Sequence, residues 1–583
     1  PNKGEGGRLR REYAEIPKLS CVTYCIYEES LLRNSYRPIL NYQLNQIPRR
    51  HHSRMKTIKS LLKQILFMAV LLCTCQAWAA VYYVDATNGD DSNAGTSEKS
   101  AWKRVAKVNG SSFKGGDSVL FKRNQTWREQ LIFPSSGTED APISIGSYGT
   151  GAKPIIDASR WYRDVSGSAN RKVGTDPATE WVAQKDNIYM THAPIANYAA
   201  IRAVREDGAW IRRGASKTGL APGEWYHIWE SPWILYYRPT SGTPGDHRIE
   251  SCYYATAIYL ENKSYITIDG LELVGSNHTD ASSPNPLVMA NVGIHGGSYI
   301  TVKNCDIHAG AHQGVRLDAT SHVIIDSNNI FYNNCGPLRA TNNCTYISVI
   351  NNKIYDNLSI NTNEFPDDIG GVLFGSLNNF HDHLTITGNE IYNNGYAGVT
   401  NTDAWVYVGC SNNFTVTHNS IHNNVGAVPM AIWGESSHFA KNGIIAYNLI
   451  YNNKTPTKNG YATVLRGNMD NVLFANNTIA NNTINSSAPA LYIYGSGTGS
   501  AMTNIRVFNN ILYENKNASY TTHEIELGVA AYHDTTGTKF DNNLFYRSTL
   551  TGTIATYHRV SYGLDQIQGS KPGTWQYDTS EAH

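Results

Sequence analysis

The chain has 583 residues and a formal net charge of +1, and charged side chains make up only 17% of it. Residues 1–80 hold 13 of the 49 basic side chains but 5 of the 48 acidic ones, so the remainder carries a net charge of about −7. A mildly acidic chain with sparse charge argues against nucleic acid as a partner, because phosphate binding needs basic surface.

The N-terminal part reads as two segments that precede the folded protein. Residues 1–54 lack an initiator Met and are rich in Arg, so we interpret them as an upstream, non-native segment. Residues 55–80 have the form of a signal peptide. Met55 is followed by three lysines, an apolar run over 65–72, and Ala77-Trp78-Ala79 as an A-x-A cleavage site. The run is too short to span a bilayer, and no later run qualifies. We therefore expect a secreted or periplasmic bacterial monomer without a membrane span.

The next two segments differ in composition. Residues 81–180 are expected to form an N-terminal cap and the first coils, with a short helix over 100–108 that shields one end of the core. Residues 181–250 are rich in aromatic residues, including Trp210, Trp225 and Tyr237, and read as an inserted β-module. Such rings either stack on sugars or fill the module's own core, and we favour the core because small β-modules need one.

Residues 251–549 repeat a short phrase in which an apolar residue follows Asn and precedes an aromatic residue and Asn. Asn389-Glu390-Ile391-Tyr392-Asn393-Asn394 is a clear copy. The repeat spacing runs from roughly 23 to roughly 37 residues, which is typical of a solenoid with variable loops. The apolar anchors are Leu273, Ile307, Ile330, Ile354, Ile391, Ile421, Ile450, Ile479, Leu512 and Phe545.

Each repeat contains three short stretches in which every second residue is apolar, as in a β-strand. Asn tolerates left-handed backbone and suits a sharp corner, and stacked Asn side chains can bond from coil to coil. These features predict an all-β, right-handed parallel β-helix with an N-terminal cap and an inserted module. A stacked antiparallel sandwich would not repeat an Asn corner in register. The tail, residues 550–583, has no evident terminal cap, so we expect a truncated end.

Five cysteines remain beyond the signal, and their spacing matches no zinc motif. Cys335 and Cys344 are close enough in sequence for a local disulfide, but buried thiols in the stack are an equal alternative.

The front of the mature chain carries a second pattern. Tyr82-Tyr83-Val84-Asp85, then 89–96 (GDDSNAGT), then Ala101-Trp102-Lys103-Arg104-Val105 follow one another. Together with the Asn repeat, this resembles the pectate-lyase-like right-handed parallel β-helix superfamily of secreted bacterial polysaccharide-active proteins, over most of 81–549. The resemblance is specific for the fold and weak for the reaction.

In that superfamily, the strand after the long loop lines the substrate groove. If Val315 and Leu317 point inward, Arg316 and Asp318 point outward, and Arg339 occupies the column of Arg316 about 4.8 Å away in the next coil. Stacked like charges repel, so an anion should neutralise them. One coil before Arg316, His295 is a further candidate for the groove. The candidates in the coils after Arg339 are Asp367, Asp368, Asp403, Trp433, Arg466 and Tyr494. Solvated surface charges with local ion pairs are the alternative.

The resemblance implies a lyase that cleaves an extended acidic polysaccharide by β-elimination. The proton beside a uronate carboxylate is weakly acidic, so the enzyme must neutralise the carboxylate and supply a base. Superfamily lyases commonly use Ca²⁺ and a Lys or Arg base, whereas no Lys lies on the expected groove strands. The resulting assignment is Arg316, Arg339, Asp367 and Asp403 as catalytic; His295, Trp433, Arg466 and Tyr494 as substrate-binding; and Asp318, Asp367, Asp368 and Asp403 as Ca²⁺ ligands.

Two other functions stay open. Asp367-Asp368 and Asn401-Thr402-Asp403 are similar to the paired aspartates of β-helix polygalacturonases, which favours an inverting glycoside hydrolase. Alternatively, the chain is a non-catalytic carbohydrate-binding or surface protein. A lyase releases an ultraviolet-absorbing unsaturated product, a hydrolase releases reducing ends without it, and a binding protein releases neither.

Overall fold

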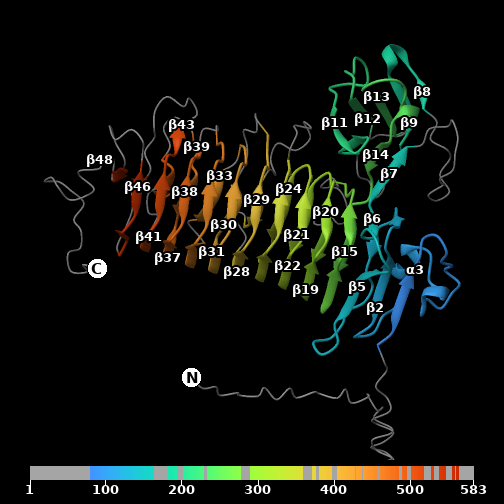
Figure 1. The fold of residues 1–583 in the computed structure, drawn as a ribbon, viewed down its shortest axis with the longest axis horizontal. Helices are drawn as coiled ribbons and strands as arrows, with labels where there is room; N and C mark the ends of the chain where they lie inside the picture. The colour runs from blue at the N-terminus through green and yellow to red at the C-terminus, as the bar shows by residue number, and fades with distance from the viewer. Residues whose placement is uncertain are drawn as a thin grey trace, which may run out of the picture. The chain divides into compact units, whose positions relative to one another are not determined.

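The computed structural model describes the part of the chain that forms three long sheets, one sheet of eight strands and one pair of strands (Figure 1). The described residues are 79–162, 181–193, 201–228, 233–277, 289–358, 370–375, 380–396, 404–426, 428–435, 438–455, 460–484, 489–495, 501–517, 527–530, 537–546, 555–557 and 560–562. Residues 1–54, nearly all of the signal peptide and most of 550–583 lie outside this set.

Sheet A has 13 strands, and each described neighbour pair in it is parallel. Its strands are β1 (Val81–Val84), β2 (Ser118–Lys122), β5 (Ile143–Tyr148), β16 (Ile266–Asp269), β19 (Ser298–Lys303), β22 (Ser321–Asp326), β25 (Thr345–Ile350), β28 (His381–Thr387), β31 (Ser411–Thr417), β34 (Ala440–Ala446), β37 (Met469–Ala475), β41 (Met502–Phe508) and β45 (Lys539–Asp541).

Sheet B has 12 strands and contains the apolar anchors of the sequence repeat. Its strands are β3 (Thr126–Trp127), β6 (Ile155–Asp157), β17 (Glu272–Val274), β20 (Asp306–His308), β23 (Asn329–Phe331), β26 (Lys353–Tyr355), β29 (Glu390–Tyr392), β32 (Ser420–His422), β35 (Leu449–Tyr451), β38 (Thr478–Ala480), β42 (Ile511–Tyr513) and β46 (Leu544–Tyr546). Ile330 pairs with Ile354, and Ile354 with Ile391, so the anchors form one buried column.

Sheet C has 13 strands and follows the long loops. Its strands are β4 (Leu131–Ile132), β15 (Thr256–Glu261), β18 (Ala290–His295), β21 (Gln313–Asp318), β24 (Gly336–Thr341), β27 (Val372–Phe374), β30 (Ala404–Gly409), β33 (Val428–Gly434), β36 (Thr463–Gly467), β40 (Leu491–Tyr494), β44 (Leu527–Ala530), β47 (Ala555–Tyr557) and β48 (Val560–Tyr562). Only the last pair, β47 with β48, is antiparallel among the described pairs of this sheet. Three parallel sheets that share one core confirm the predicted β-helix and rule out the sandwich.

The two Asn residues at each corner between coils have different tasks. The first of each pair has left-handed backbone, as at Asn423 (φ +56°) and Asn452 (φ +54°). The second is buried and bonds to the equivalent residue one coil on: Asn424 Nδ2 donates to Asn453 Oδ1 at 3.0 Å. A second buried column, which includes Asn389 and Asn419, does the same at the other end of each sheet B strand. The predicted Asn ladder therefore exists, and it is double.

The N-terminal end carries a shorter helix than expected. A 3-10 turn, η2 (Glu98–Ser100), precedes α3 (Val105–Asn109), whose Val105 and Val108 are fully buried. Trp102 packs beside them on the core. The predicted helix over 100–108 is thus displaced towards the C-terminal side, and it still covers the first coil.

A separate eight-stranded sheet interrupts the coils between β6 and β15. Its order is β7 (Ser159–Tyr162), β14 (Ile249–Cys252), β10 (Val204–Glu206), β11 (Ala209–Arg213), β12 (Glu224–Ile228), β13 (Ile234–Arg238), β9 (Tyr189–His192) and β8 (Val182–Ala183). Two 3-10 turns, η3 (Lys185–Asn187) and η4 (Pro244–Asp246), join its strands, and β39 (Thr483–Ile484) pairs with β43 (Lys516–Asn517) elsewhere. Trp225 and Tyr237 are fully buried in a core of this sheet, as expected for aromatics that fill the module itself.

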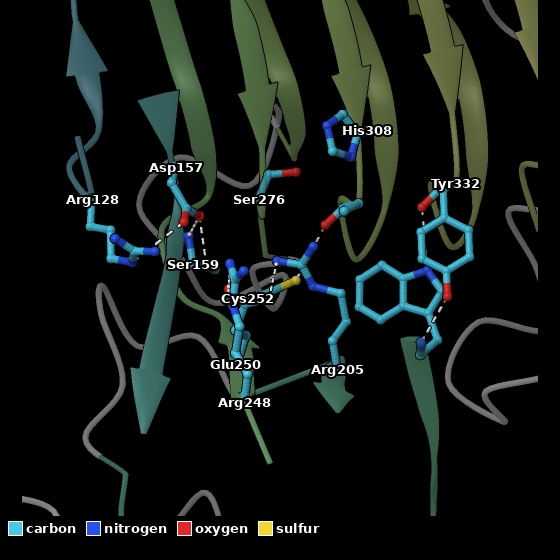
Figure 2. Close-up of polar contacts among 12 residues, drawn as sticks. Arg128, Asp157, Ser159, Arg205, Arg248, Glu250, Cys252, Ser276, His308 and Tyr332 are labelled. Carbon is cyan, nitrogen blue, oxygen red and sulfur yellow. Dashed lines mark hydrogen bonds and ion pairs between the residues drawn. The ribbon is translucent and has the colours of Figure 1, made fainter. Parts of the chain in front are cut away.

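A tyrosine of the coils bonds to this module, and buried charge pairs lie within the module and within the coils (Figure 2). Arg205 Nη2 lies 3.3 Å from Glu250 Oε2, and both side chains are at least nine-tenths buried. Arg128 Nε lies 3.5 Å from Asp157 Oδ2, where burial raises the pKa of Asp157 against the opposing charge of Arg128. The Trp210 amide donates to Tyr332 Oη at 2.8 Å. The hydrogen bond from Trp210 to Tyr332 therefore links module and coils, whereas each ion pair stabilises only the part that contains it.

The five described cysteines are all free and buried. Burial raises the pKa of Cys252 and Cys305 to about 12 and that of Cys344 to about 11. Cys335 and Cys344 are therefore buried thiols in the stack and do not form the local disulfide that was the alternative.

Candidate active site

The outer face of sheet C carries two columns of side chains that run from coil to coil. Val315 and Leu317 of β21 are fully buried in the core, so the alternation of the strand directs Arg316 and Asp318 to the other face. The parallel register places Arg316 beside Arg339 and Asp318 beside His295. The predicted Arg column is therefore present, and a His–Asp column runs next to it.

Asp318 and His295 form a close pair. His295 Nδ1 lies 2.6 Å from Asp318 Oδ2, and the His295 side chain is 26% exposed whereas Asp318 is fully buried. The hydroxyl of Thr341 donates to Asp318 Oδ1 at 2.7 Å, and the amide of Asn342 donates to the same oxygen. A carboxylate held by two further donors fixes the imidazole with Nδ1 towards Asp318, so that Nε2 lies on the opposite side of the ring.

Arg316 and Arg339 are adjacent positive charges at the same edge. Arg316 is nearly fully buried, and its Nη1 lies 3.4 Å from Gln313 Oε1, while Arg339 is half-buried. The parallel ladder holds the two backbones one strand spacing apart, about 4.8 Å. Gly293, which has no side chain, precedes Arg316 in this column and lies two residues from His295. The geometry thus puts two guanidinium groups next to an oriented imidazole, an arrangement suited to an anionic ligand that carries an acidic proton.

Further along the same face, the His–Asp column becomes aromatic. Trp433 of β33 pairs with Arg466 of β36, which pairs with Tyr494 of β40. The Arg466 guanidinium carbon lies 3.6 Å from the Trp433 ring centroid and 5.3 Å from that of Tyr494. Tyr461 and Tyr492 stack on each other at 4.9 Å between centroids and complete the cluster. Burial raises the pKa of Tyr461, Tyr492 and Tyr494, so these hydroxyls stay protonated and can donate.

The predicted site residues therefore fall into three sets. His295, Asp318, Arg316 and Arg339 come together on β18, β21 and β24; Trp433, Arg466 and Tyr494 come together on β33, β36 and β40; Asp367, Asp368 and Asp403 lie outside the described residues.

Asp318 differs from its prediction in one respect. It was expected as an exposed Ca²⁺ ligand, but it is fully buried, and both of its oxygens accept hydrogen bonds. A fully buried carboxylate that already accepts three hydrogen bonds does not fit a calcium ligand, because Ca²⁺ needs room beside it for several further oxygens. Its neighbours in the fold explain the difference, because Thr341 follows Asp318 in the same column and turns a hydroxyl towards it.

Two contributors were missed in the sequence. Thr341 and Asn342 support Asp318, and the register alone could have identified Thr341, since it follows Arg339 by two residues, as Asp318 follows Arg316. Asn342 could not have been identified, because its side chain bonds across the coil from a left-handed backbone (φ +54°).

A second group of potential ligands lies in the module. Glu206, Asp207 and His247 bring their ligand atoms within 4.8 Å of one another. His247 Nδ1 lies 2.8 Å from Asp207 Oδ2, and its Nε2 lies 2.8 Å from the carbonyl oxygen of Ser241. Burial lowers the pKa of His247, but these contacts with oxygen acceptors outweigh burial and raise it. Both ring nitrogens are therefore engaged in closing a turn, and we assign the group a structural role.

Comparison with known proteins identifies the fold family. Residues 234–404 and 376–545 match the family model described as the right-handed beta helix region. The chain belongs to this family. No helix in the described part of the chain has the length and apolar character of a membrane span.

Individual relatives are more distant. A lacto-N-biosidase of Bifidobacterium longum subsp. longum is 30% identical over 175 residues, which are 25% of this chain and 11% of that protein. The chain therefore matches only about a tenth of that relative. Among solved structures, XylC with xylose shares 11% identity at a TM-score of 0.47, covering 78% of this chain and 86% of that one. A GH136 lacto-N-biosidase of Eubacterium ramulus shares 14% at a TM-score of 0.37, covering 89% and 75%.

Proposed function

We propose that this chain is a polysaccharide lyase that cleaves a uronate-containing polymer by β-elimination, with His295 as the base. The 2.6 Å contact between His295 Nδ1 and Asp318 Oδ2, next to the stacked Arg316 and Arg339, carries the proposal. The resemblance offered Arg316 or Arg339 as the base or as the clamp on the carboxylate, but a guanidinium does not release its proton near neutral pH. An imidazole oriented by a carboxylate can accept a proton near neutral pH, which a guanidinium cannot do.

The reaction needs a proton to leave the carbon beside the uronate carboxylate. His295 Nε2 accepts that proton from C5, the C4–O bond breaks, and a C4–C5 double bond forms. The leaving oxygen takes a proton from solvent. Asp318, which contacts Nδ1, stabilises the imidazolium that forms.

The two arginines neutralise the uronate carboxylate. As the C5 proton leaves, negative charge spreads onto the carboxylate oxygens, and guanidinium N–H groups already in place stabilise it. A planar guanidinium suits a carboxylate because it can donate two parallel hydrogen bonds. A neutral sugar offers no such group, so this end of the face favours acidic polymers.

Calcium stays a prediction for Asp367, Asp368 and Asp403. Asp318, the one proposed calcium ligand among the described residues, does not fit that role, and no step of the reaction above requires calcium. Activity measured after chelation, and again after adding Ca²⁺ or Mg²⁺, tests the prediction: recovery with Ca²⁺ alone supports it, and unchanged activity in chelator contradicts it.

A glycoside hydrolase is the second candidate, and the similarity to a lacto-N-biosidase favours it. That chemistry needs two carboxyl groups on opposite sides of the bond. On the described outer face, Asp318 is committed to His295, so the pair would have to come from other carboxyl groups, such as Asp367 and Asp403 or the exposed Glu261 beside His295. The elimination reading uses the side chains whose contacts are known, and we therefore prefer it.

The test is a screen of polygalacturonate, alginate and chondroitin polymers with the secreted form, read by ultraviolet absorbance and by reducing ends. A lyase raises both, and His295→Ala abolishes both. The matched control is His308→Gln: His308 also pairs with a carboxylate, Glu272 at 2.9 Å, but it lies on sheet B, so its loss should leave activity unchanged. Reducing ends without absorbance would instead establish the hydrolase, and binding without either product a carbohydrate-binding protein.

A further inference from the structure

Arg466 lies at the aromatic end of the outer face of sheet C, far from His295. Six strand steps separate β18 from β36, which is roughly 29 Å at the spacing of paired strands. The residues before and after Arg466 in its column are Trp433 and Tyr494. This charge therefore belongs to a different part of the face from the Arg316 and Arg339 pair.

The faces of the Arg466 guanidinium are covered by rings. Its carbon lies 3.6 Å from the Trp433 centroid on one neighbouring strand and 5.3 Å from the Tyr494 centroid on the other. A guanidinium donates only in its own plane, so stacking leaves its edge for hydrogen bonds. Stacked rings also hold the plane at a fixed angle, which preorganises that edge for a planar or tetrahedral oxyanion.

The charge of Arg466 has no compensating carboxylate in the described part of the chain. Two other half-buried or buried arginines there do have a carboxylate partner: Arg128 pairs with Asp157 and Arg205 with Glu250. Around Arg466 the polar groups are tyrosine hydroxyls, and the indole Nε1 of Trp433 is buried without a hydrogen-bond partner. A partly buried cation surrounded by neutral donors attracts an anion.

We propose that Arg466 is the centre of an anion subsite that binds a carboxylate or sulfate group on a sugar, with Trp433 and Tyr494 as its walls. The inference rests on the proposed function for the idea that the ligand is a saccharide. It adds that the polymer bears negative charge well away from the bond that is cleaved, so the substrate is charged along its length.

Binding is measured by calorimetry on the full chain with His295→Ala, so that the probes survive. The probes are oligogalacturonates, the same oligomers with carboxyl groups reduced to alcohols, and sulfated galactan oligomers. Arg466→Met should weaken binding of a charged probe by about tenfold or more and leave the reduced probe unchanged, since one charge-assisted contact is lost. Tighter binding of the uronate or of the sulfated probe tells the two sources apart.

Arg466→Lys and Arg506→Met complete the design. The lysine variant keeps the charge but not the planar edge, and should retain intermediate affinity, which also shows that a folded variant was measured. Arg506 is an exposed arginine on β41 of sheet A, and its loss should change nothing. Equal weakening of charged and reduced probes by Arg466→Met, or no binding of any charged probe, overturns the proposal. Charge-selective binding without cleavage of any polymer would instead refute the lyase and leave the subsite standing.

Discussion

The buried Asn ladder allows a quantitative prediction for Asn424→Ala. Asn424 Nδ2 donates to Asn453 Oδ1 at 3.0 Å and to the Ile391 carbonyl at 2.9 Å. Its Oδ1 accepts from the backbone N of Asn394 at 3.0 Å and from Asn394 Nδ2 at 2.9 Å. Alanine removes these four buried bonds. At about 1 kcal/mol each, the expected loss is about 4 kcal/mol, because the partners cannot reach water.

The measurement is urea unfolding followed by circular dichroism, with hydrogen exchange to resolve the coils around residues 391–453 separately. A solenoid opens locally, so exchange should rise in these coils first. Asn423→Gly is the matched control. Asn423 is exposed, its φ of +56° suits glycine, and the change should cost less than about 1 kcal/mol. A loss for Asn424→Ala within that same range would refute the ladder as a source of stability.

Asn424→Asp extends the test to pH. The carboxylate can still accept from Asn394, but it cannot donate to Ile391 or Asn453, so the ionised form faces two acceptors. Burial and these acceptors raise its folded pKa above the ordinary value of about 3.9. Stability of this variant is therefore highest below that value and is lost as pH rises through the folded pKa. An unfolding midpoint independent of pH would contradict this reasoning.

Three further predictions follow from named contacts. Asp318→Asn removes the charge that orients His295, and should lower kcat by about 10²- to 10⁴-fold with little change in KM, measured on the polymer that the screen identifies. Burial lowers the pKa of His247, but its bonds to Asp207 and a carbonyl outweigh burial and raise it; the module should therefore lose stability as pH rises above about 6.5, and His247→Gln should abolish that dependence. Tyr332→Phe removes one bond to Trp210 and should cost about 1 kcal/mol, seen as faster exchange in the module alone.

The fold could be predicted because a parallel solenoid repeats its chemistry in register. Ile330, Ile354 and Ile391 fall in one column of sheet B, and the step from Arg316 to Arg339 is one strand. Period-2 alternation in short strands fixes which side chains face out. Both the repeat spacing and the alternation are local properties of the chain, so they can be predicted from the sequence alone.

The start of the module and the burial of the site could not be predicted in this way. Strand β7 begins at Ser159, before the expected boundary, because it pairs antiparallel with β14 after the module has closed. Tyr265, Tyr299 and Tyr346 have left-handed backbone, which the sequence pattern assigned to Asn. Asp318 is buried because Thr341 and Asn342 of the next coil bond to it. Each of these depends on a partner far away in the chain.

The difference between the repetitive and the varied columns locates function in this molecule. Stacking places the same position of each coil side by side. Asn residues in such a column form ladders of hydrogen bonds, and aromatic rings in such a column stack, as Tyr299 and His322 do at 4.4 Å between centroids. Columns selected for stability therefore repeat. The outer face of sheet C does not repeat: Gly293, Arg316 and Arg339 follow one another, and tyrosines come later. Stacking alone rewards none of these changes, and stacked like charges oppose it, which is the physical reason for assigning the proposed function to this face.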